Sequence, residues 1–206
     1  LTLAMIDLDE QRFEKIISSS TLKVGFERTM LNIIYPFLSK IGIMWLTDAV
    51  NPAQEHFITN LIRQKVIVAI DGQYETFDEK AKKYMLFLPE GELHELGLLF
   101  ANYLIRAKGN KVIYLGQNMP FDDLSMVYDT YQPDYLFTIL TNNSRAFDPK
   151  EYLANLSELF PNTEILVSGS QIIGEDLGLP DNVIEVANPN RILEFISAHQ
   201  SESVSK

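Results

Sequence analysis

The sequence predicts a helical region followed by a doubly wound α/β region. Two observations carry this prediction. Apolar residues follow a helical period from Leu8 to about Gly72, with no strand-like alternation between them. After DGQYETFDEK, short apolar runs alternate five times with amphipathic or turn-like runs. Such alternation is typical of a parallel sheet that is covered by helices on both faces.

The first region, residues 1–75, reads as a bundle of about four helices. DLDEQRFEKIISSS begins with acidic residues that suit a helix N-terminus, and residues 21–45 form a long apolar-striped run that we expect Pro36 to kink or divide. Asn51 is a good N-cap for the next helix, with Pro52 in the first helical position and Gln54 three residues after the cap. The boundary with the second region is expected between residues 71 and 80, where charge and glycine interrupt the apolar pattern.

The second region, residues 76–206, reads as a five-stranded, flavodoxin-like domain. Its predicted strands are residues 84–88, 111–115, 134–140, 163–169 and 182–186. The segments that follow them are predicted helices at 96–109, 121–131, 149–160 and 189–199, with a short turn at 171–178 after the fourth strand. The polar tail QSESVSK is expected to be loose.

Composition excludes several classes of function. The net charge of −11 repels phosphate backbones, so this chain by itself should not bind nucleic acid. Cysteine is absent and only three histidines occur, which leaves no disulfide or thiolate chemistry and little material for a zinc site made of protein ligands. No apolar run approaches the roughly 20 residues of a membrane-spanning helix, and no signal peptide is evident, so a cytoplasmic location is expected.

Three polar stretches are expected to meet at one edge of the predicted sheet. Open α/β sheets bind ligands beyond the carboxyl ends of their strands, where the strand order reverses. PEGELHELG follows the first strand, TILTNN closes the third and SGSQI closes the fourth. The crevice between the first and third strands is therefore the predicted ligand site.

The first of these stretches holds a candidate metal ligand, His94. A histidine near a helix start is often only a surface or capping residue. Glu92, two positions earlier, could accept a hydrogen bond from one ring nitrogen, as partners of metal-bound histidines commonly do. Gly97, three positions later, leaves room for the close approach of a bulky group.

These residues carry a resemblance to a known family. Glu92, His94 and Gly97 resemble the cobalamin-binding motif Asp-x-His-x-x-Gly, with glutamate in place of aspartate. The family's Ser-x-Leu motif is matched by Thr138-Ile139-Leu140, 40 residues after Gly97. Its Gly-Gly pair is matched by Gly169-Ser170, 28 residues after Leu140.

The helical region supplies a more specific sign. Trp45, the only tryptophan, is followed after nine residues by Glu55-His56. This spacing, in a helical bundle directly before a cobalamin domain, resembles the light-sensing, adenosylcobalamin-binding regulators of the MerR type. Without the resemblance, Trp45 would be read as a core residue, Glu55 as a helix-dipole acid and His56 as a polar group at the bundle end. Glu55 also lies on the same helix face as Ile58 and Ile62.

The resemblance implies a cobalamin-dependent regulator that is not an enzyme. In it, His94 coordinates cobalt from below in place of the cofactor's own base, and Glu92 orients the ring. The displaced nucleotide tail runs into a crevice flanked by Thr138, Leu140 and Gly169. The adenosyl group is surrounded by Trp45, Glu55 and His56. A homo-oligomer is implied, and DNA binding would come from an upstream domain outside this chain.

Two positions depart from the family pattern, and two other functions stay open. Leu46 stands where well-known members have a histidine directly after the tryptophan, and Ser170 replaces the second glycine of Gly-Gly. A corrinoid carrier for methyl transfer also combines a helical cap with this kind of domain. A cofactor-free interaction module of the same fold is the third reading. Trp45, Glu55 and His56 favour the sensor over the carrier.

Overall fold

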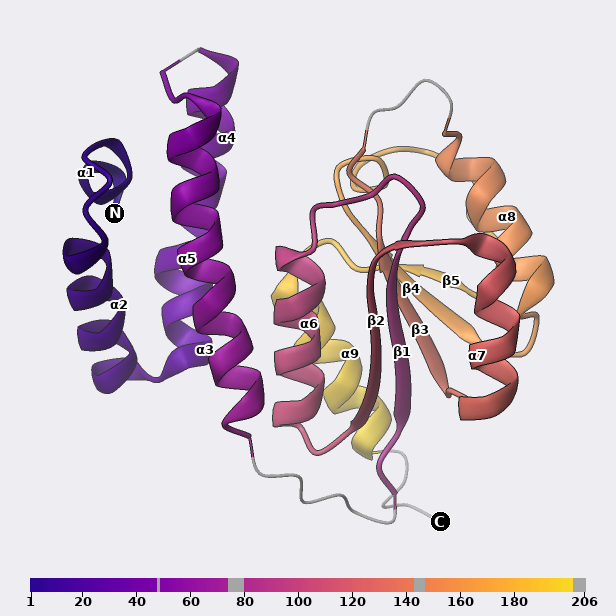
Figure 1. The fold of residues 1–206 in the computed structure, drawn as a ribbon. Helices are drawn as coiled ribbons and strands as arrows, with labels where there is room; N and C mark the ends of the chain where they lie inside the picture. Colours follow the sequence, from indigo (N-terminus) through magenta and orange to yellow (C-terminus); the bar gives the residue numbers. More distant parts are fainter. Residues whose placement is uncertain (48, 74–79, 143–146, 202–206) are drawn as a thin grey trace. The chain divides into compact units, whose positions relative to one another are not determined.

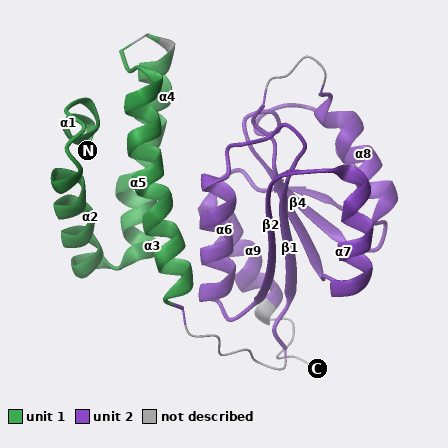
Figure 2. Ribbon diagram, viewed as in Figure 1, with its two compact units in different colours: residues 1–72 green, residues 73–206 purple. Residues whose placement is uncertain are grey.

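The computed structural model describes residues 1–47, 49–73, 80–142 and 147–201. The chain divides into two compact units, Leu1–Gly72 and Gln73–Lys206 (Figure 2). The boundary predicted between residues 75 and 76 falls in the segment 74–79, outside the described residues. No helix in the described ranges combines the length and the apolar character that a membrane crossing requires.

Every regular element in the described part of the first unit is a helix. Its elements are α1 (Thr2–Ile6), α2 (Glu10–Val24), α3 (Phe26–Thr29), the π-helix η1 (Met30–Ile34), α4 (Tyr35–Leu46) and α5 (Pro52–Asp71). The sequence did not predict α1, which is only five residues long. The apolar sides of the helices supply a core that includes Phe13, Ile17, Met30, Ile58 and Ile62.

Local signals explain where these helices begin and bend. Asp9 caps α2 by accepting a hydrogen bond from the Arg12 amide, and the capping box predicted at the start of α5 is present, with Asn51 and Gln54 bonded reciprocally. The π-helix ends at Ile34, two residues before Pro36, which supplies no N–H and crowds the preceding turn. Pro36 therefore marks a local change of helix geometry instead of a break.

The second unit is a five-stranded parallel sheet with helices on both faces (Figure 1). The strands are β1 (Lys83–Pro89), β2 (Lys111–Met119), β3 (Tyr135–Ile139), β4 (Glu164–Ser168) and β5 (Val183–Glu185). The helices are α6 (Leu96–Ala107), the 3₁₀ turn η2 (Phe121–Asp123), α7 (Leu124–Tyr131), α8 (Pro149–Leu159) and α9 (Pro189–Ser201). The order β2-β1-β3-β4-β5 confirms the predicted flavodoxin-like fold.

Two apolar layers enclose this sheet. Side chains such as Leu86 and Phe137 pack against α6 and α9, while Phe87, Leu136 and Leu140 pack on the other face with α7 and α8. Alternation of side chains along each strand divides them between the two layers. Because β1 lies between β2 and β3, the chain reverses direction across the sheet at β1, and the loops at the carboxyl ends of β1 and β3 become neighbours.

Candidate functional site

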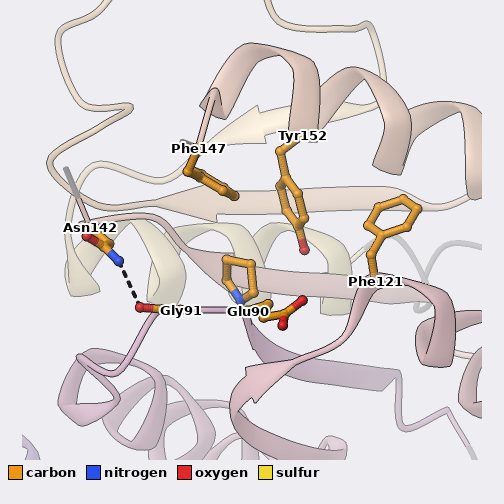
Figure 3. A pocket seen from close by; sticks show the side chains of 7 residues that line it. Glu90, Gly91, Phe121, Asn142, Phe147 and Tyr152 are labelled. Carbon is orange, nitrogen blue, oxygen red and sulfur yellow. Dashed lines mark hydrogen bonds between the residues drawn. The ribbon is translucent and has the colours of Figure 1, made fainter. Parts of the chain in front are cut away.

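The candidate site is built on the loop of residues 90–95, which joins β1 to α6 and is called here the histidine loop. Gly91 turns the chain with a φ of +81°, a conformation that glycine adopts without strain. Its amide donates to Asn118 Oδ1 at 2.8 Å, and its carbonyl accepts from Asn142 Nδ2 at 2.8 Å (Figure 3). The loop is therefore fastened to the ends of β2 and β3.

Glu92 anchors the histidine loop from inside the protein. Its side chain is 2% exposed. Oε2 accepts hydrogen bonds from the Thr141 amide, the Thr141 hydroxyl and the Asn142 amide, each at 2.7 Å. Oε1 faces His94, from which it accepts the backbone N–H at 3.0 Å. Both oxygens of a buried carboxylate are thus used, one by the loop after β3 and the other by the histidine loop itself.

The hydrogen bonds determine the ionisation state of Glu92. Burial by itself would raise the pKa of this carboxyl group, because it disfavours the charge. The side-chain and backbone hydrogen bonds from His94 and Thr141 outweigh burial and hold the pKa of Glu92 well below its usual range. Glu92 is therefore a carboxylate throughout the physiological pH range.

This carboxylate fixes the orientation of the His94 ring. Nδ1 lies 2.6 Å from Glu92 Oε1 and 3.1 Å from Thr141 Oγ1. An ionised carboxylate can only accept, so Nδ1 carries the proton, and in the neutral ring the lone pair is on Nε2. The His94 side chain is 74% exposed, whereas Glu92 is buried. The arrangement presents an imidazole of defined tautomer at the protein surface, with the geometry of a metal ligand and its supporting carboxylate.

Five more side chains hold the histidine loop, and the sequence analysis did not name them as site residues. Two of them lie near the end of β2. Asn118, which has a φ of +55°, accepts a hydrogen bond from the Gly91 amide, and Gln117 donates one to the Leu93 carbonyl. Tyr114 on β2 donates to the carboxylate of Glu95 at 3.1 Å. Thr141 and Asn142 come from the loop after β3, as described above. The polar runs GQN and LTNN at the ends of β2 and β3 were the sequence signal that could have indicated these residues.

Gly97, on the first turn of α6, lies against β3. A Cβ atom at this position would stand 2.9 Å from Ile139 Cδ1, so a side chain there would displace its neighbour. Ile139 is 9% exposed and belongs to the core layer between the sheet and α6. The room left by Gly97 is therefore occupied by the Ile139 side chain.

The predicted tail-binding residues lie at the same edge of the sheet, on more than one face. Leu140 packs in the layer of α7 and α8, on the other side from Ile139. Gly169, with a φ of +111°, packs so closely on the Leu140 backbone that a Cβ atom would lie 2.2 Å from its carbonyl oxygen. Ser170, the next residue, is exposed. Thr138 is fully buried, and its hydroxyl has no hydrogen-bond partner in the described part of the chain.

The three predicted residues of the helical unit occupy the ends of α4 and α5. Trp45 is next to last in α4 and is 46% exposed, a large exposed area for an aromatic side chain. Glu55 and His56 lie on the first turns of α5, and His56 Nδ1 is 2.9 Å from Glu55 Oε2. Ile58 and Ile62 on the Glu55 face are buried, as the spacing predicts. The Leu46 side chain lies outside the described part of the structure.

The fold and the site define a class of protein: a helical unit joined to a flavodoxin-like domain that presents a carboxylate-supported histidine at its switch point. Residues 1–69, which are nearly all of the helical unit, match the family described as B12 binding domain. The chain is also 26% identical over 153 residues to the HTH-type transcriptional repressor CarH of Myxococcus xanthus. That alignment covers 74% of this chain and 50% of the repressor, so the chain spans about half the length of this curated relative.

Solved structures show the same fold. The monomethylamine corrinoid protein of Methanosarcina barkeri matches with a TM-score of 0.59 and 14% identity, over 76% of each chain. The methanol:cobalamin methyltransferase complex MtaBC of the same organism matches with a TM-score of 0.50 and 10% identity, over 98% of this chain and 78% of that one. These structures show the fold alone; the match of residues 1–69 to the B12 binding domain and the similarity to CarH confirm the resemblance to cobalamin-binding regulators.

Proposed function

We propose that this chain is the light-sensing region of a transcriptional regulator, that it binds adenosylcobalamin, and that it acts by binding instead of catalysis. The observation that carries the proposal is the buried Glu92 carboxylate that holds an exposed His94 at the switch point of the sheet. His94 would coordinate cobalt through Nε2. The similarity to a transcriptional repressor supports the regulatory part of the proposal.

The residues of this chain fit a corrinoid in two respects. An imidazole whose Nδ1–H is held by a carboxylate is a more basic ligand through its other nitrogen, and it keeps its orientation without a metal. The buried Thr138 hydroxyl lacks a partner among the described residues and can bond to a polar group on the sheet face of Leu136 and Leu140, opposite Ile139. Glu92 would keep the Nδ1 proton in place while His94 binds, and Thr141 and Asn142 would keep Glu92 ionised.

The helical unit would recognise the adenosyl group. The exposed ring of Trp45 offers a surface on which a planar base can stack, and Glu55 and His56 offer polar groups. Adenosylcobalamin supplies a light-labile cobalt–carbon bond when bound. Loss of the ligand that these residues recognise would favour a second state of the protein, and an oligomer would then change its assembly. Contact with DNA is assigned to a part of the protein outside this acidic chain.

Ile139 gives a test of the tail-binding part of the proposal. Its side chain fills the room beside Gly97, so a nucleotide tail that enters between α6 and β3 must displace it. We expect Ile139→Ala to bind cobalamin about tenfold more tightly than wild type, although the truncation should lower the free energy of unfolding by about 2–4 kcal/mol. Titrations followed by visible absorbance measure the affinity.

Cobinamide, a corrinoid that has no nucleotide tail, is the control for this variant. Its affinity should be the same for wild type and Ile139→Ala, because no tail enters beside Gly97. An equal gain for cobalamin and cobinamide would show that the effect is a general loosening of the domain. No gain for cobalamin would place the tail elsewhere.

The proposed function is tested by light. The protein is mixed with adenosylcobalamin in the dark, its visible spectrum and elution volume are recorded, and both are recorded again after illumination. We expect a spectrum of cobalamin ligated by histidine, with its own base displaced, and a light-driven change in elution volume. Methylcobalamin should bind more weakly, because it lacks the group that Trp45 is proposed to recognise.

The other outcomes identify the alternatives. Tight binding of both cobalamins without any change of assembly in light would favour a corrinoid carrier for methyl transfer. Absence of binding would leave a cofactor-free interaction module. Either result would overturn the sensor.

A further inference from the structure

A pocket lies beside the histidine loop, on the side of the sheet that carries α8. Its volume is about 340 Å³, at the lower end of the range of about 300–1,000 Å³ that is usual for small-molecule sites. Three aromatic side chains line it, from η2, from the residue before the N-cap of α8, and from α8 itself: Phe121, Phe147 and Tyr152. Glu90, Gly91 and Asn142 line the opposite side (Figure 3).

The aromatic side chains form one packed wall. The Tyr152 ring centroid lies 5.7 Å from that of Phe121, with the rings edge to face, and 5.2 Å from that of Phe147, with the rings tilted. Contacts of this kind hold the rings in place, so the wall is formed before any ligand arrives. Figure 3 shows Tyr152 between the two phenylalanines, with its hydroxyl directed towards Glu90.

The Tyr152 hydroxyl lacks a hydrogen-bond partner in the described part of the chain, although its oxygen is buried. Leaving such a group unpaired costs stability, and unpaired polar groups in native proteins commonly belong to sites for water or a ligand. Burial raises the pKa of Tyr152 well above its usual range, so the hydroxyl keeps its proton. It can donate one hydrogen bond and accept another.

The charge of the lining decides the class of ligand. Among the described residues that line the pocket, Glu90 alone carries a charge, and it is exposed at the rim. Aromatic ring faces attract cations within about 6 Å of the ring centroid, and the net charge of −11 favours cations further. We propose that this pocket binds a small organic ammonium ion that also carries a hydroxyl or amine group, with the cation against the aromatic wall and Glu90, and the polar group on Tyr152.

The pocket is connected to the histidine loop through Gly91, which belongs to the loop, and through Asn142, which is hydrogen-bonded to it. Asn142 Nδ2 donates to the Gly91 carbonyl, and the Asn142 amide donates to Glu92. A ligand in the pocket would therefore change the surroundings of the Gly91 and Asn142 amides, which gives a local signal for binding. The proposal does not depend on cobalamin, and its test uses the chain without it.

Choline is the probe, because it combines a quaternary ammonium ion with one hydroxyl group. It is titrated into the isotopically labelled chain while amide NMR signals are followed. We expect the signals of Gly91 and Asn142 to shift in a saturable manner across the millimolar range. The matched ligand is 3,3-dimethylbutan-1-ol, in which carbon replaces the charged nitrogen, and it should bind at least about tenfold more weakly.

Two variants assign the contacts. Tyr152→Phe should weaken choline about fivefold and leave tetramethylammonium, which has no hydroxyl, unchanged. Glu90→Gln, at an exposed position, should weaken both cations about threefold. Glu158→Gln on the exposed face of α8 is the surface control and should change neither. If Tyr152→Phe fails to fold, Glu90→Gln still tests the proposal.

Three results would overturn it. Equal affinity for choline and its neutral analogue would show that charge is not recognised. A second such result is that Glu90→Gln binds both cations with unchanged affinity and Tyr152→Phe keeps the wild-type ratio of choline to tetramethylammonium affinity. The cation would then bind elsewhere. Absence of any saturable shift at Gly91 and Asn142 would show that the pocket binds neither probe.

Discussion

Replacing His94 with alanine is expected to abolish the histidine-ligated spectrum of bound cobalamin and to weaken cobalamin binding by at least about 100-fold. The imidazole is 74% exposed and is held by one carboxylate and one hydroxyl, so its removal takes away the proposed cobalt ligand and little of the core. The free energy of unfolding should change by less than about 1 kcal/mol. Visible absorbance measures the spectrum and the affinity, and urea denaturation measures the stability.

His199→Ala is the matched histidine control. The His199 ring stacks on Phe195 with centroids 4.0 Å apart and lies against Tyr135, the first residue of β3. It therefore belongs to the amino-terminal edge of the sheet, and its removal should leave the cobalamin spectrum unchanged. If His94→Ala keeps the wild-type spectrum and affinity, His94 is not the cobalt ligand.

Replacing Glu92 with alanine is expected to lower the free energy of unfolding by about 3–5 kcal/mol, the largest stability effect that we predict for this chain. The truncation leaves the partly buried amides of Thr141 and Asn142 and the Thr141 hydroxyl without their acceptor. It also removes the carboxylate that holds His94 Nδ1 and leaves Thr141 Oγ1 as the contact of that nitrogen in the loop after β3. Urea denaturation followed by circular dichroism measures the loss, with the exposed Glu158→Ala as the control.

Glu92→Gln separates the structural role of the carboxylate from its effect on His94. The amide oxygen can still accept from Thr141 and Asn142, so this variant should be more stable than Glu92→Ala. Its NH₂ group then faces His94 Nδ1 and favours the tautomer that carries the proton on Nε2. That tautomer has no lone pair on Nε2, the nitrogen proposed to bind cobalt, so cobalamin binding should weaken about 10–100-fold. Wild-type affinity in Glu92→Gln would contradict this role of Glu92.

The same carboxylate makes stability depend on pH. The native pKa of Glu92 is lowered, whereas the pKa of an unfolded glutamate is about 4.3. Ionised Glu92 therefore stabilises the fold above about pH 4.3, and this contribution is lost as the pH falls below that value. The stability difference between wild type and Glu92→Gln should be constant near neutral pH and shrink by up to about 1.4 kcal/mol per pH unit in acid. A difference that stays constant to pH 3 would show that Glu92 is not held ionised.

Most of the architecture could be predicted because it depends on short-range patterns. The helical period of the first 72 residues, the capping box at Asn51 and the five alternating segments all act within one element or its neighbour. Two features of the helical unit were not predicted from the sequence. The short α1 carries too few residues to show a period, and the π-helix before Pro36 depends on how one turn accommodates a missing N–H.

The sequence by itself determined that the side chains of Glu92 and His94 can form a hydrogen-bonded pair, because two residues that are two positions apart on one loop are neighbours in any fold. It also determined that the loop follows a first parallel strand, which places it at a ligand edge. Only the tertiary structure showed that Thr141 and Asn142 keep Glu92 buried and ionised, and that Asn118 holds Gly91. The reason is the strand order. Thr141 and Asn142 are about 50 residues from Glu92 in sequence, and they reach it only because β3 lies directly beside β1.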